Sequence, residues 1–380
     1  MKAIFINDTS GTSNPGCQGT VACLLQLLMQ SGVNITSRSP VGYCYHEFAQ
    51  CDVAMPLLSL QQRIMRRITK AVSASKPVVA AAPKLCPERW NHSIEQFAAR
   101  IEPVWAEADQ LIVNGEGTIH HDAIGARNLI GLCLAGKKLG KRISILNCSI
   151  YDLSETLLAA LRDSVDQIIV REPISHRYLN NQGIQSTLAA DCLFLAAQRK
   201  NPDVVLPKTI VDQVADKARV AVYTPGVLSG TGQVTGALVQ NDIQQLKDTG
   251  YKVLYYVVEA EDEHLASAAK QAGAAIIPLG AMNWMELLTF MKSVSLVVSG
   301  RYHINIFAAI CGVSFLPMQT NTSKMDGLLE LLGHASQSVR ALDNEHNTLN
   351  FENCIHASAE VTKEICNQLQ TVAYSEEFSA

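Results

Sequence analysis

Short apolar runs alternate with amphipathic segments along the chain. Apolar runs of strand length lie at Ala3–Ile6, Pro77–Ala81, Gln110–Val113, Ile143–Leu146 and Gln167–Val170. Between them, apolar residues recur every three or four positions, which predicts helices at Thr20–Leu28, Ile94–Trp105 and Leu129–Leu139. Strands that are apolar throughout and alternate with helices are typical of a parallel sheet covered on both faces.

The alternation stops at a polar, proline-bearing stretch, residues 198–207, and then restarts. Further strands are expected at Arg219–Tyr223, Lys252–Val258, Ala275–Pro278, Ser295–Ser299 and Ser314–Met318. Further helices are expected at Gly236–Lys247, Glu261–Gln271, Asn283–Met291, Asn305–Cys311, Met325–Leu332 and Cys354–Val372. We therefore predict an α/β protein with two Rossmann-like parallel-sheet domains, residues 1–200 and 207–350, which face a cleft in a GT-B-like architecture. Residues 351–380 are expected to form a helix that packs back toward the first domain.

Composition and charge narrow the function classes. A formal net charge of −4 gives no electrostatic reason to expect nucleic-acid binding. No apolar run is long enough to span a bilayer, and the N-terminus enters a short strand without the pattern of a secretory signal, so we expect a cytoplasmic protein. The 11 cysteines form no CxxC pair or Cys/His cluster, which predicts reduced, mostly buried thiols and no metal site.

The loops after the strands are the first places to look for ligand-binding residues, because parallel sheets bind ligands beyond the carboxyl ends of their strands. The loop after the first strand, residues 7–20, is rich in small residues and hydrogen-bonding side chains, but it has neither a dinucleotide fingerprint nor a P-loop. Turn and helix-capping chemistry is an equal alternative for this loop. Its candidate residues are Asn7, Asp8, Asn14, Gly16 and Gln18.

A second glycine-bearing loop, residues 114–122, is expected directly after the strand Gln110–Val113. Its glycines allow the backbone to approach a ligand, and Glu116 or a nearby histidine is a candidate acid or base. Adjacent histidines seldom point at the same ion, which disfavours a metal here. The candidates in this loop are Asn114, Gly115, Glu116, His120 and His121.

Two strand ends carry arginines. Arg171 ends the strand at 167–170 and suits bidentate anion binding, although an ion pair with Glu172 or Asp191 is an even alternative. The strongest signal is residues 297–309, where an apolar strand runs through Gly300, Arg301, Tyr302 and His303 into a helix.

The free N–H groups and positive end of such a helix bind anions, Arg301 adds positive charge, and His303 can transfer a proton. The alternative is a purely structural role, in which the histidine caps the helix and the arginine lies on the surface. Lys324, after the next strand, could add a cation to the same cleft.

A basic face is predicted near residue 65. Arg63, Arg66, Arg67 and Lys70 share one side of a helix, which could rest on an anionic membrane surface. A solvated charged face is the commoner outcome of such a pattern.

From about residue 4 to residue 335, the order of these segments resembles the polysaccharide pyruvyl transferase family. The resemblance is carried by Asn14-Pro15-Gly16, the stretch NGEGTIHHD, VREPIS, Ala190-Asp191 and, above all, SGRYH at residues 299–303. The chain departs from the family pattern where the family has a run of glycines, here at residues 114–117, and where its first loop usually continues with an acidic residue, here Cys17-Gln18-Gly19.

The resemblance implies a phosphoenolpyruvate donor, no cofactor, and a product in which pyruvate is ketal-linked to a sugar. Arg171, Gly300, Arg301, Tyr302, His303 and Lys324 would bind the donor. His303 would act as general acid, and Glu116 or Asp8 would accept a hydroxyl proton. Asn7, Asn14, Gly16, Gln18, Asn114, Gly115, His120 and His121 would face the sugar acceptor.

Two other functions fit the same pattern. A GT-B-type glycosyltransferase would use the helix start at Gly300 for the diphosphate of a nucleotide sugar. A non-catalytic carbohydrate-binding protein is disfavoured, because it does not need an arginine and a histidine together at a helix start.

Overall fold

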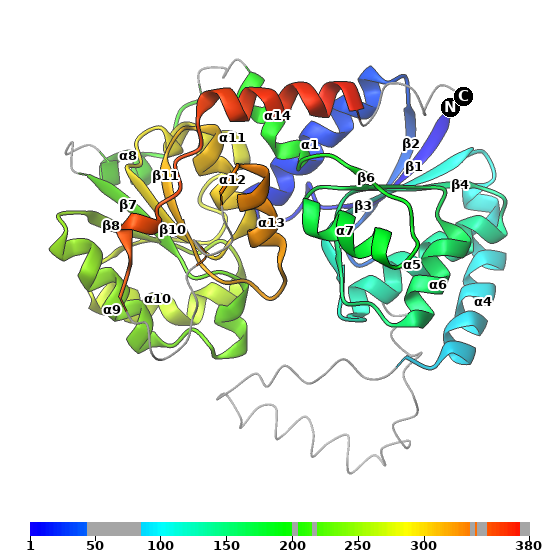
Figure 1. Cartoon of the computed structure of the whole chain (residues 1–380), viewed down its shortest axis with the longest axis horizontal. Helices are drawn as coiled ribbons and strands as arrows, with labels where there is room; N and C mark the ends of the chain where they lie inside the picture. Colours follow the sequence, from blue (N-terminus) through cyan, green and yellow to red (C-terminus); the bar gives the residue numbers. More distant parts are fainter. Residues whose placement is uncertain (44–84, 200–203, 215–218, 335–338, 340–347, 373–380) are drawn as a thin grey trace, which may run out of the picture.

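The computed structural model describes residues 1–43, 85–199, 204–214, 219–334, 339 and 348–372 of the chain. Two parallel sheets, each flanked by helices, lie side by side (Figure 1). The first sheet has six strands in the order β2-β1-β3-β4-β5-β6, and the second has five in the order β11-β10-β7-β8-β9. The predicted pair of parallel-sheet domains is confirmed.

The first sheet is built from residues before 190. Its strands are β1 (Lys2–Asp8), β2 (Asn34–Pro40), β3 (Gln110–His120), β4 (Arg142–Tyr151), β5 (Gln167–Val170) and β6 (Thr187–Leu188). The helices that cover it are α1 (Pro15–Gln30), α4 (Pro87–Trp105), α5 (Ile124–Lys138), α6 (Glu155–Ser164) and α7 (Pro173–Asn181), followed by the 3-10 helix η1 (Cys192–Gln198).

The second sheet repeats the pattern. Its strands are β7 (Val220–Thr224), β8 (Lys252–Tyr256), β9 (Ala275–Ile277), β10 (Leu296–Ser299) and β11 (Ser314–Pro317). Its helices are α8 (Lys208–Val214), α9 (Gly236–Asp248), α10 (Ala266–Gln271), α11 (Trp284–Met291), α12 (Tyr302–Ile310) and α13 (Lys324–Leu331). The short 3-10 helices are η2 (Val227–Thr231), η3 (Ala260–Leu265) and η5 (Phe351–Asn353).

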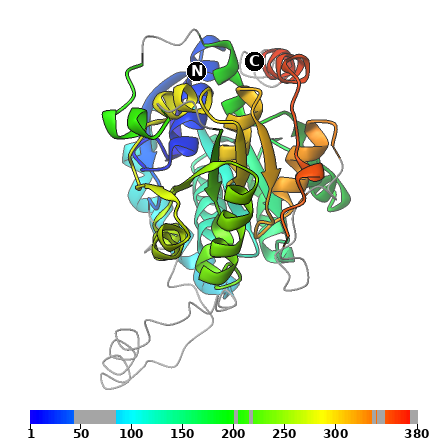
Figure 2. The same cartoon turned by 90° about the vertical axis from the view of Figure 1, so that its left-hand side faces the viewer.

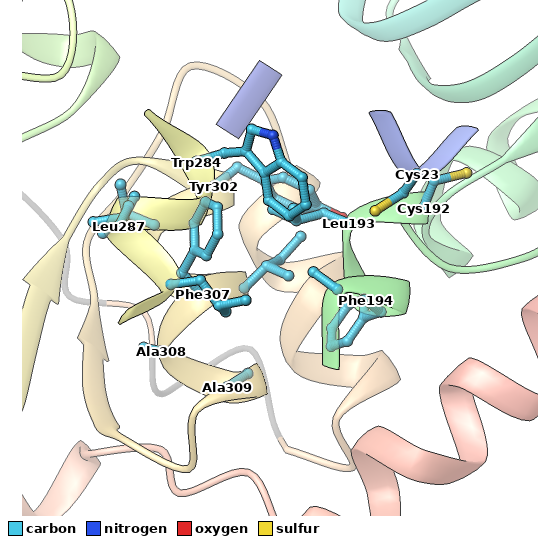
Figure 3. Packing of buried hydrophobic residues seen from close by; sticks show 14 of the residues in the cluster. Cys23, Cys192, Leu193, Phe194, Trp284, Leu287, Tyr302, Phe307, Ala308 and Ala309 are labelled. Atoms are coloured by element: carbon cyan, nitrogen blue, oxygen red, sulfur yellow. The ribbon is translucent and has the colours of Figure 1, made fainter. Parts of the chain in front are cut away.

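One of the three hydrophobic clusters in the described part of the chain runs through both domains. It joins the fully buried Phe5 and Ile112 of the first sheet to the fully buried Leu287 and Phe307 of the second domain. Leu193 and Phe194 of η1 lie beside Trp284, Tyr302 and Phe307 where the domains meet (Figure 3). The domains therefore meet through apolar packing, and the elements that flank this packing are held in fixed positions.

The C-terminal helix α14 (Ala359–Val372) lies across the top of the junction in Figure 1. Its Cys366 Sγ donates to the Phe194 carbonyl at 3.1 Å, and Gln370 Nε2 donates to Gln198 Oε1 at 2.8 Å. The turned view shows the same helix at the upper edge of the molecule (Figure 2). After the second sheet is complete, the chain thus returns to η1, at the end of the first domain.

The prediction of a loop at residues 114–120 is wrong. Strand β3 has 11 residues and continues to His120, paired with the 10-residue β4 through Asn114↔Leu146, Glu116↔Cys148 and His120↔Tyr151. Gly115 permits this pairing, because a Cβ there would lie 2.4 Å from the Cβ of Cys148. The candidate residues of this stretch are consequently held on a strand, with a register shift between Glu116 and Ile119.

Several other element bounds differ from the prediction. Helix α12 begins at Tyr302 rather than Asn305, because Arg301 already has the extended backbone of an N-cap. The helix expected at Glu261–Gln271 is divided into η3 and α10, and α14 begins at Ala359 rather than Cys354.

Two strands, β2 and β6, and three helices, α6, α7 and α8, were not predicted. Strand β2 has the polar sequence NITSRSP, which an edge strand tolerates because little of it is buried. Strand β6 has only two residues, and α8 follows the expected linker directly. The strand expected at Pro77–Ala81 and the basic face of Arg63, Arg66, Arg67 and Lys70 lie outside the described residues.

Candidate active site

A cavity of about 210 Å³ lies between the two domains. The first domain contributes Asn14, Cys17, Glu116, Gly117, Thr118 and Arg171 to its wall. The second contributes Val227, Val258, Gly300, Arg301, Tyr302, His303, Ile304 and Lys324. Eight of the sequence candidates therefore line one cavity, and they come from both domains.

Backbone strain is concentrated beside this cavity. Within the described ranges, the non-glycine residues with positive φ are Asn7, Glu116, His121, Asp122, Asn147 and Asp152. All six lie on or directly after the carboxyl halves of β1, β3 and β4. Such backbone costs roughly 1–3 kcal/mol per residue and persists where the surroundings enforce it, typically at functional sites.

Arg171 is the centre of a buried ionic network. Its Nη1 lies 2.8 Å from Asp191 Oδ2, and its Nε donates to Ser149 Oγ at 2.9 Å. The alternative of an ion pair with Asp191 is therefore realised, whereas Glu172 caps α7. Burial alone would raise the pKa of Asp191, but His303 and Arg171 outweigh it and hold that pKa far below its usual range. Asp191 is thus an anion at any physiological pH.

The same carboxylate orients His303. The imidazole Nε2 lies 3.4 Å from Asp191 Oδ2, 3.2 Å from Arg171 Nη1 and 3.4 Å from Thr20 Oγ1. Nδ1 has no hydrogen-bond partner among the described residues. A histidine held through one nitrogen by a buried carboxylate, with the other nitrogen free beside a cavity, is arranged for proton transfer.

Gly16 allows this histidine to reach the first domain. A Cβ at Gly16 would lie 2.3 Å from the Cβ and 2.6 Å from the Nδ1 of His303. Only glycine can therefore occupy position 16, in the first turn of α1, while α12 lies this close. Gly16 contributes to the site through its missing side chain.

Glu116 places a carboxylate on the first-domain side of the cavity. Its backbone has φ 41°, and its side chain is only 6% exposed. Thr9 Oγ1 at 2.6 Å and Asn114 Nδ2 at 2.9 Å donate to Oε1, and Cys17 Sγ at 3.1 Å donates to Oε2. Burial and the nearby Glu116 raise the pKa of Cys17 well above its usual value, so the thiol stays protonated.

The N-terminus of α12 supplies hydrogen-bond donors to the cavity. Gly300 N–H donates to the Thr224 carbonyl at 3.1 Å, and Arg301 N–H donates to Ser299 Oγ at 2.9 Å. The next three N–H groups, those of Tyr302, His303 and Ile304, have no acceptor in the described part of the chain, and all three residues line the cavity. An anion at this helix end would therefore bind to the N–H groups of Tyr302, His303 and Ile304 rather than to that of Gly300.

Arg301 is held by carboxylates of its own domain. Its guanidinium lies 3.1 Å from Glu261 Oε1 and 2.8 Å from Asp262 Oδ1, and Asp262 is fully buried. Burial would lower the pKa of Arg301, but Asp262 and Glu261 raise it above its ordinary value. The arginine thus ties the start of α12 to η3, and its charge is already compensated.

Lys324 is the third cation of the cavity, at the first position of α13. Its nearest recorded partner is Asn321 Oδ1 at 3.5 Å. Burial, Arg171 and Arg301 lower the pKa of Lys324 to about 7. A Cβ at Gly117 would lie 3.1 Å from Arg171 Nη2 and 3.6 Å from Lys324 Nζ, so both cations approach the backbone of β3 at this glycine.

The remaining candidates of the first loop hold the two domains and β3 in place. Asn14 Oδ1 caps α1, and its Nδ2 donates to Glu259 Oε1 of the second domain at 2.6 Å. Gln18 Oε1 accepts from the Trp284 N–H at 3.3 Å, also across the junction. Asn7 and Asn114 donate to each other's backbone carbonyls at 2.7 Å and 3.2 Å and join β1 to β3.

Asp8, His120 and His121 are among the candidates that do not line the cavity. The Asp8 carboxylate lies 2.6 Å from Arg38 Nη2 and accepts from Ser10 N–H at 3.0 Å. His120 ends β3 and His121 follows it directly, with their Nδ1 atoms 2.8 Å apart. Burial, Lys324 and His121 lower the pKa of His120 to about 4, so its imidazole is neutral.

Sequence reasoning assigned no role to Thr20, Cys17 or the carboxylates of η3, and it named Asp191 as a possible partner of Arg171 and as part of the Ala190-Asp191 segment of the family resemblance. Asp191 had one usable signal, because it follows the last strand of the first domain and caps η1. Glu261 and Asp262 had none, since a helix pattern does not show which distant arginine its carboxylates meet.

Among the described residues, no group of three or more histidine, cysteine, aspartate or glutamate side chains is arranged to hold a metal ion. No helix in those residues is long and apolar enough to cross a membrane. All nine cysteines of the described segments are free thiols.

Comparison with solved structures finds the same overall fold in several enzymes. It is similar to the putative UDP-N-acetylglucosamine 2-epimerase of Listeria monocytogenes, with TM-score 0.54 and 13% identity over 100% of this chain and 93% of that one. It is also similar to the epimerase of Methanocaldococcus jannaschii in complex with UDP-GlcNAc and UDP (TM-score 0.55, 9% identity, 97% and 99% coverage). A spinosyn rhamnosyltransferase complexed with thymidine diphosphate gives TM-score 0.53 and 12% identity over 97% and 96% of the chains. Identities this low show the shared GT-B-like fold alone.

The family assignment comes from the sequence. No curated protein matches the chain. The family model for polysaccharide pyruvyl transferases matches residues 36–321, a span that includes Glu116, Arg171, Asp191, Arg301 and His303. The cavity between the domains is lined or supported by these same residues, and the chain belongs to the polysaccharide pyruvyl transferase family.

Proposed function

We propose that this protein transfers the enolpyruvyl group of phosphoenolpyruvate to two hydroxyls of one sugar, forming a pyruvate ketal and releasing phosphate. The observation that carries the proposal is the convergence of anion-binding groups and His303 in one cavity between the domains. The acceptor is proposed to be a sugar of a bacterial surface polysaccharide or of its precursor, in keeping with the family.

The donor carries a phosphate and a carboxylate, and the cavity offers groups for both. The unpaired N–H groups of Tyr302, His303 and Ile304 lie at the positive end of α12, which suits one anionic group. Arg171 and Lys324 approach the opposite wall at Gly117 and suit the other. Arg301 acts in this scheme by positioning the start of α12.

Proton transfer begins at His303 in this proposal. Protonated His303 donates its Nδ1 proton to the methylene carbon of the donor, which leaves a cationic carbon stabilised by the bridging phosphate oxygen. The first sugar hydroxyl adds to that carbon and gives its proton to Glu116. The C–O bond to the phosphate then breaks, the second hydroxyl adds to the same carbon, and its proton passes to the departing phosphate. The proton on Glu116 returns to His303 through solvent.

The net change is one donor and one diol converted to one ketal and one phosphate. Cationic groups and helix N–H donors stabilise the departing phosphate.

Glu116 is proposed as the base because its position fits that role better than that of Asp8. Glu116 lines the cavity, whereas the carboxylate of Asp8 pairs with Arg38. A buried carboxylate in an anion-binding cavity opposes substrate binding unless it serves the reaction, and here it is held at a strained backbone position. The acceptor would therefore approach from the side of the first domain.

Thermal unfolding with separate ligands tests the donor. A ligand that binds only the folded protein raises the unfolding midpoint in proportion to its occupancy. We expect a shift with phosphoenolpyruvate and none with UDP, CMP or GDP. The histidine variant His303→Ala should keep the fold, while ketal formation falls by about a hundredfold or more.

The rival function is tested by the same assay. A shift with a nucleotide and none with phosphoenolpyruvate would favour a nucleotide-sugar glycosyltransferase. Near-normal turnover in His303→Ala would remove His303 from the mechanism.

A further inference from the structure

The three cationic side chains of the cavity differ in how their charges are compensated. Arg171 pairs with Asp191 at 2.8 Å, and Arg301 pairs with Asp262 at 2.8 Å and with Glu261 at 3.1 Å. Lys324 has no carboxylate within ion-pair distance in the described part of the chain, and Asn321 Oδ1 at 3.5 Å is its nearest recorded partner. Lys324 is therefore the cation whose charge is left for a ligand.

The position of Lys324 makes that charge costly without an anion. As the first residue of α13, it lies at the positive end of the helix dipole. Its ammonium also lies near the Arg171 guanidinium, since a single Cβ at Gly117 would contact both. Two cations and a helix N-terminus facing one cavity would repel one another until a negative ligand enters.

We infer that Lys324 binds the phosphate of the donor directly and takes up a proton as the phosphate enters the cavity. The inference rests on the proposed phosphate-bearing donor, and it adds a specific partner and a coupling between binding and protonation. Above about pH 7 the amine of the free protein is mostly neutral, which avoids repulsion by the neighbouring cations, and in the complex the ammonium pairs with the phosphate oxygens. Up to one proton from solvent is bound in the process, and no covalent bond changes.

The groups that face Lys324 come from four other elements. Burial, Arg171 after β5 and Arg301 at the start of α12 lower its pKa to about 7, while Cys17 of α1 and Glu116 of β3 raise it. His120 at the end of β3 also interacts with it and is neutral, because its own pKa is lowered to about 4. A bound dianion raises the pKa of Lys324, so proton uptake is small at about pH 6 and approaches one proton at about pH 8.5.

Titration calorimetry measures this coupling. Binding of sulfate and of phosphoenolpyruvate is followed in two buffers with different ionisation enthalpies, because a proton taken from the buffer changes the observed heat. Sulfate stays a dianion throughout, and phosphoenolpyruvate is compared at about pH 8.5, well above the phosphate pKa of about 6. The variants are Lys324→Met, Lys324→Arg and, as a control, the exposed Lys270→Met outside the cavity.

Wild type and Lys270→Met should show proton uptake that grows with pH. Lys324→Met should bind both anions about tenfold to a hundredfold more weakly and without uptake. Lys324→Arg keeps a permanent charge, so it should bind without uptake and with little pH dependence. Thermal unfolding of each variant shows whether the fold is retained. If Lys324→Met does not fold, the comparison of Lys324→Arg with the wild type still tests the inference.

The outcomes separate this inference from the proposed donor. Uptake that persists in Lys324→Met or Lys324→Arg would place the proton elsewhere and overturn the inference, as would binding without uptake in the wild type. Sulfate binding with uptake, but no binding of phosphoenolpyruvate, would support the role of Lys324 and refute the donor. Phosphoenolpyruvate binding that is independent of Lys324 would support the donor and refute the role of Lys324. Failure of both anions to bind would also overturn the inference.

Discussion

The site can form in its present geometry only because Gly16 has no side chain. The Cβ of His303 is fixed by the backbone of α12, so it cannot rotate away from a methyl group placed 2.3 Å from it. Any side chain at Gly16 must therefore push α1 and α12 apart. The distance that would change is the one between His303 Nε2 and Asp191, now 3.4 Å.

Replacement of Gly16 by alanine should lower the rate of ketal formation by about a hundredfold, because a displacement of about 1 Å in a reacting group has that effect. Gly11→Ala is the matched control, since a Cβ at Gly11 meets nothing within 4 Å in the same loop. Steady-state kinetics of both variants checks the prediction. Equal rates in the two variants would show that His303 need not sit against Gly16.

Two carboxylates of η3 hold the turn between β10 and α12 in place. Arg301 crosses to the buried Asp262 and to Glu261, which is more exposed, and Ser229 of η2 donates to the same Asp262 at 3.0 Å. Asp262 also accepts from the N–H groups of Val258 and Glu259, both at 3.2 Å. One carboxylate thus links three elements at the edge of the cavity, and the start of α12 depends on it.

Arg301→Ala should destabilise the protein by about 3 kcal/mol, because it leaves the Asp262 carboxylate buried without its cation. Glu261→Gln removes the exposed partner of the same arginine and should cost less than about 1 kcal/mol. Urea unfolding of the two variants gives the free energies of unfolding. Similar losses for both would mean that Asp262 is satisfied by its backbone and serine donors alone.

The two domains share one core, which determines how the whole molecule should unfold. Leu193 of η1, at the end of the first domain, is fully buried in the cluster that contains Trp284 and Phe307 of the second domain (Figure 3). The helix α14 contacts η1 from the other side of the same junction (Figure 1). Separation of the domains would expose this apolar surface, so neither domain is expected to unfold alone.

Calorimetry of the full chain should therefore show one cooperative transition, with calorimetric and van't Hoff enthalpies that agree. Leu193→Ala should shift the whole transition and cost about 2–5 kcal/mol. Val205→Ala is the control, because Val205 is 84% exposed and its truncation should change the free energy of unfolding by less than about 0.5 kcal/mol. Two resolved transitions would show that the shared core does not couple the domains.

Local patterns in the sequence were enough for the architecture. The periodicity of apolar residues reports which face of each element is buried, so it located nine of the eleven strands within the described residues and most helices. The two strands it missed, β2 and β6, are an exposed polar edge and a pair of residues, for which burial leaves little signal. The run from strand to helix at residues 297–309 likewise pointed to Gly300, Arg301 and His303, because their chemistry and their place at a strand end are adjacent in the chain.

Only the tertiary structure decided how the charges of the site are paired. Arg171, Arg301 and Lys324 are alike in the sequence as cations after strands, but the first two meet carboxylates 20 and 39 residues away and the third meets none among the described residues. The long β3 and its strained Glu116 likewise depend on the similarly long β4 beside it. Periodicity records the burial of each element, whereas ion pairing and close backbone approach depend on residues that are distant in sequence and adjacent only after folding.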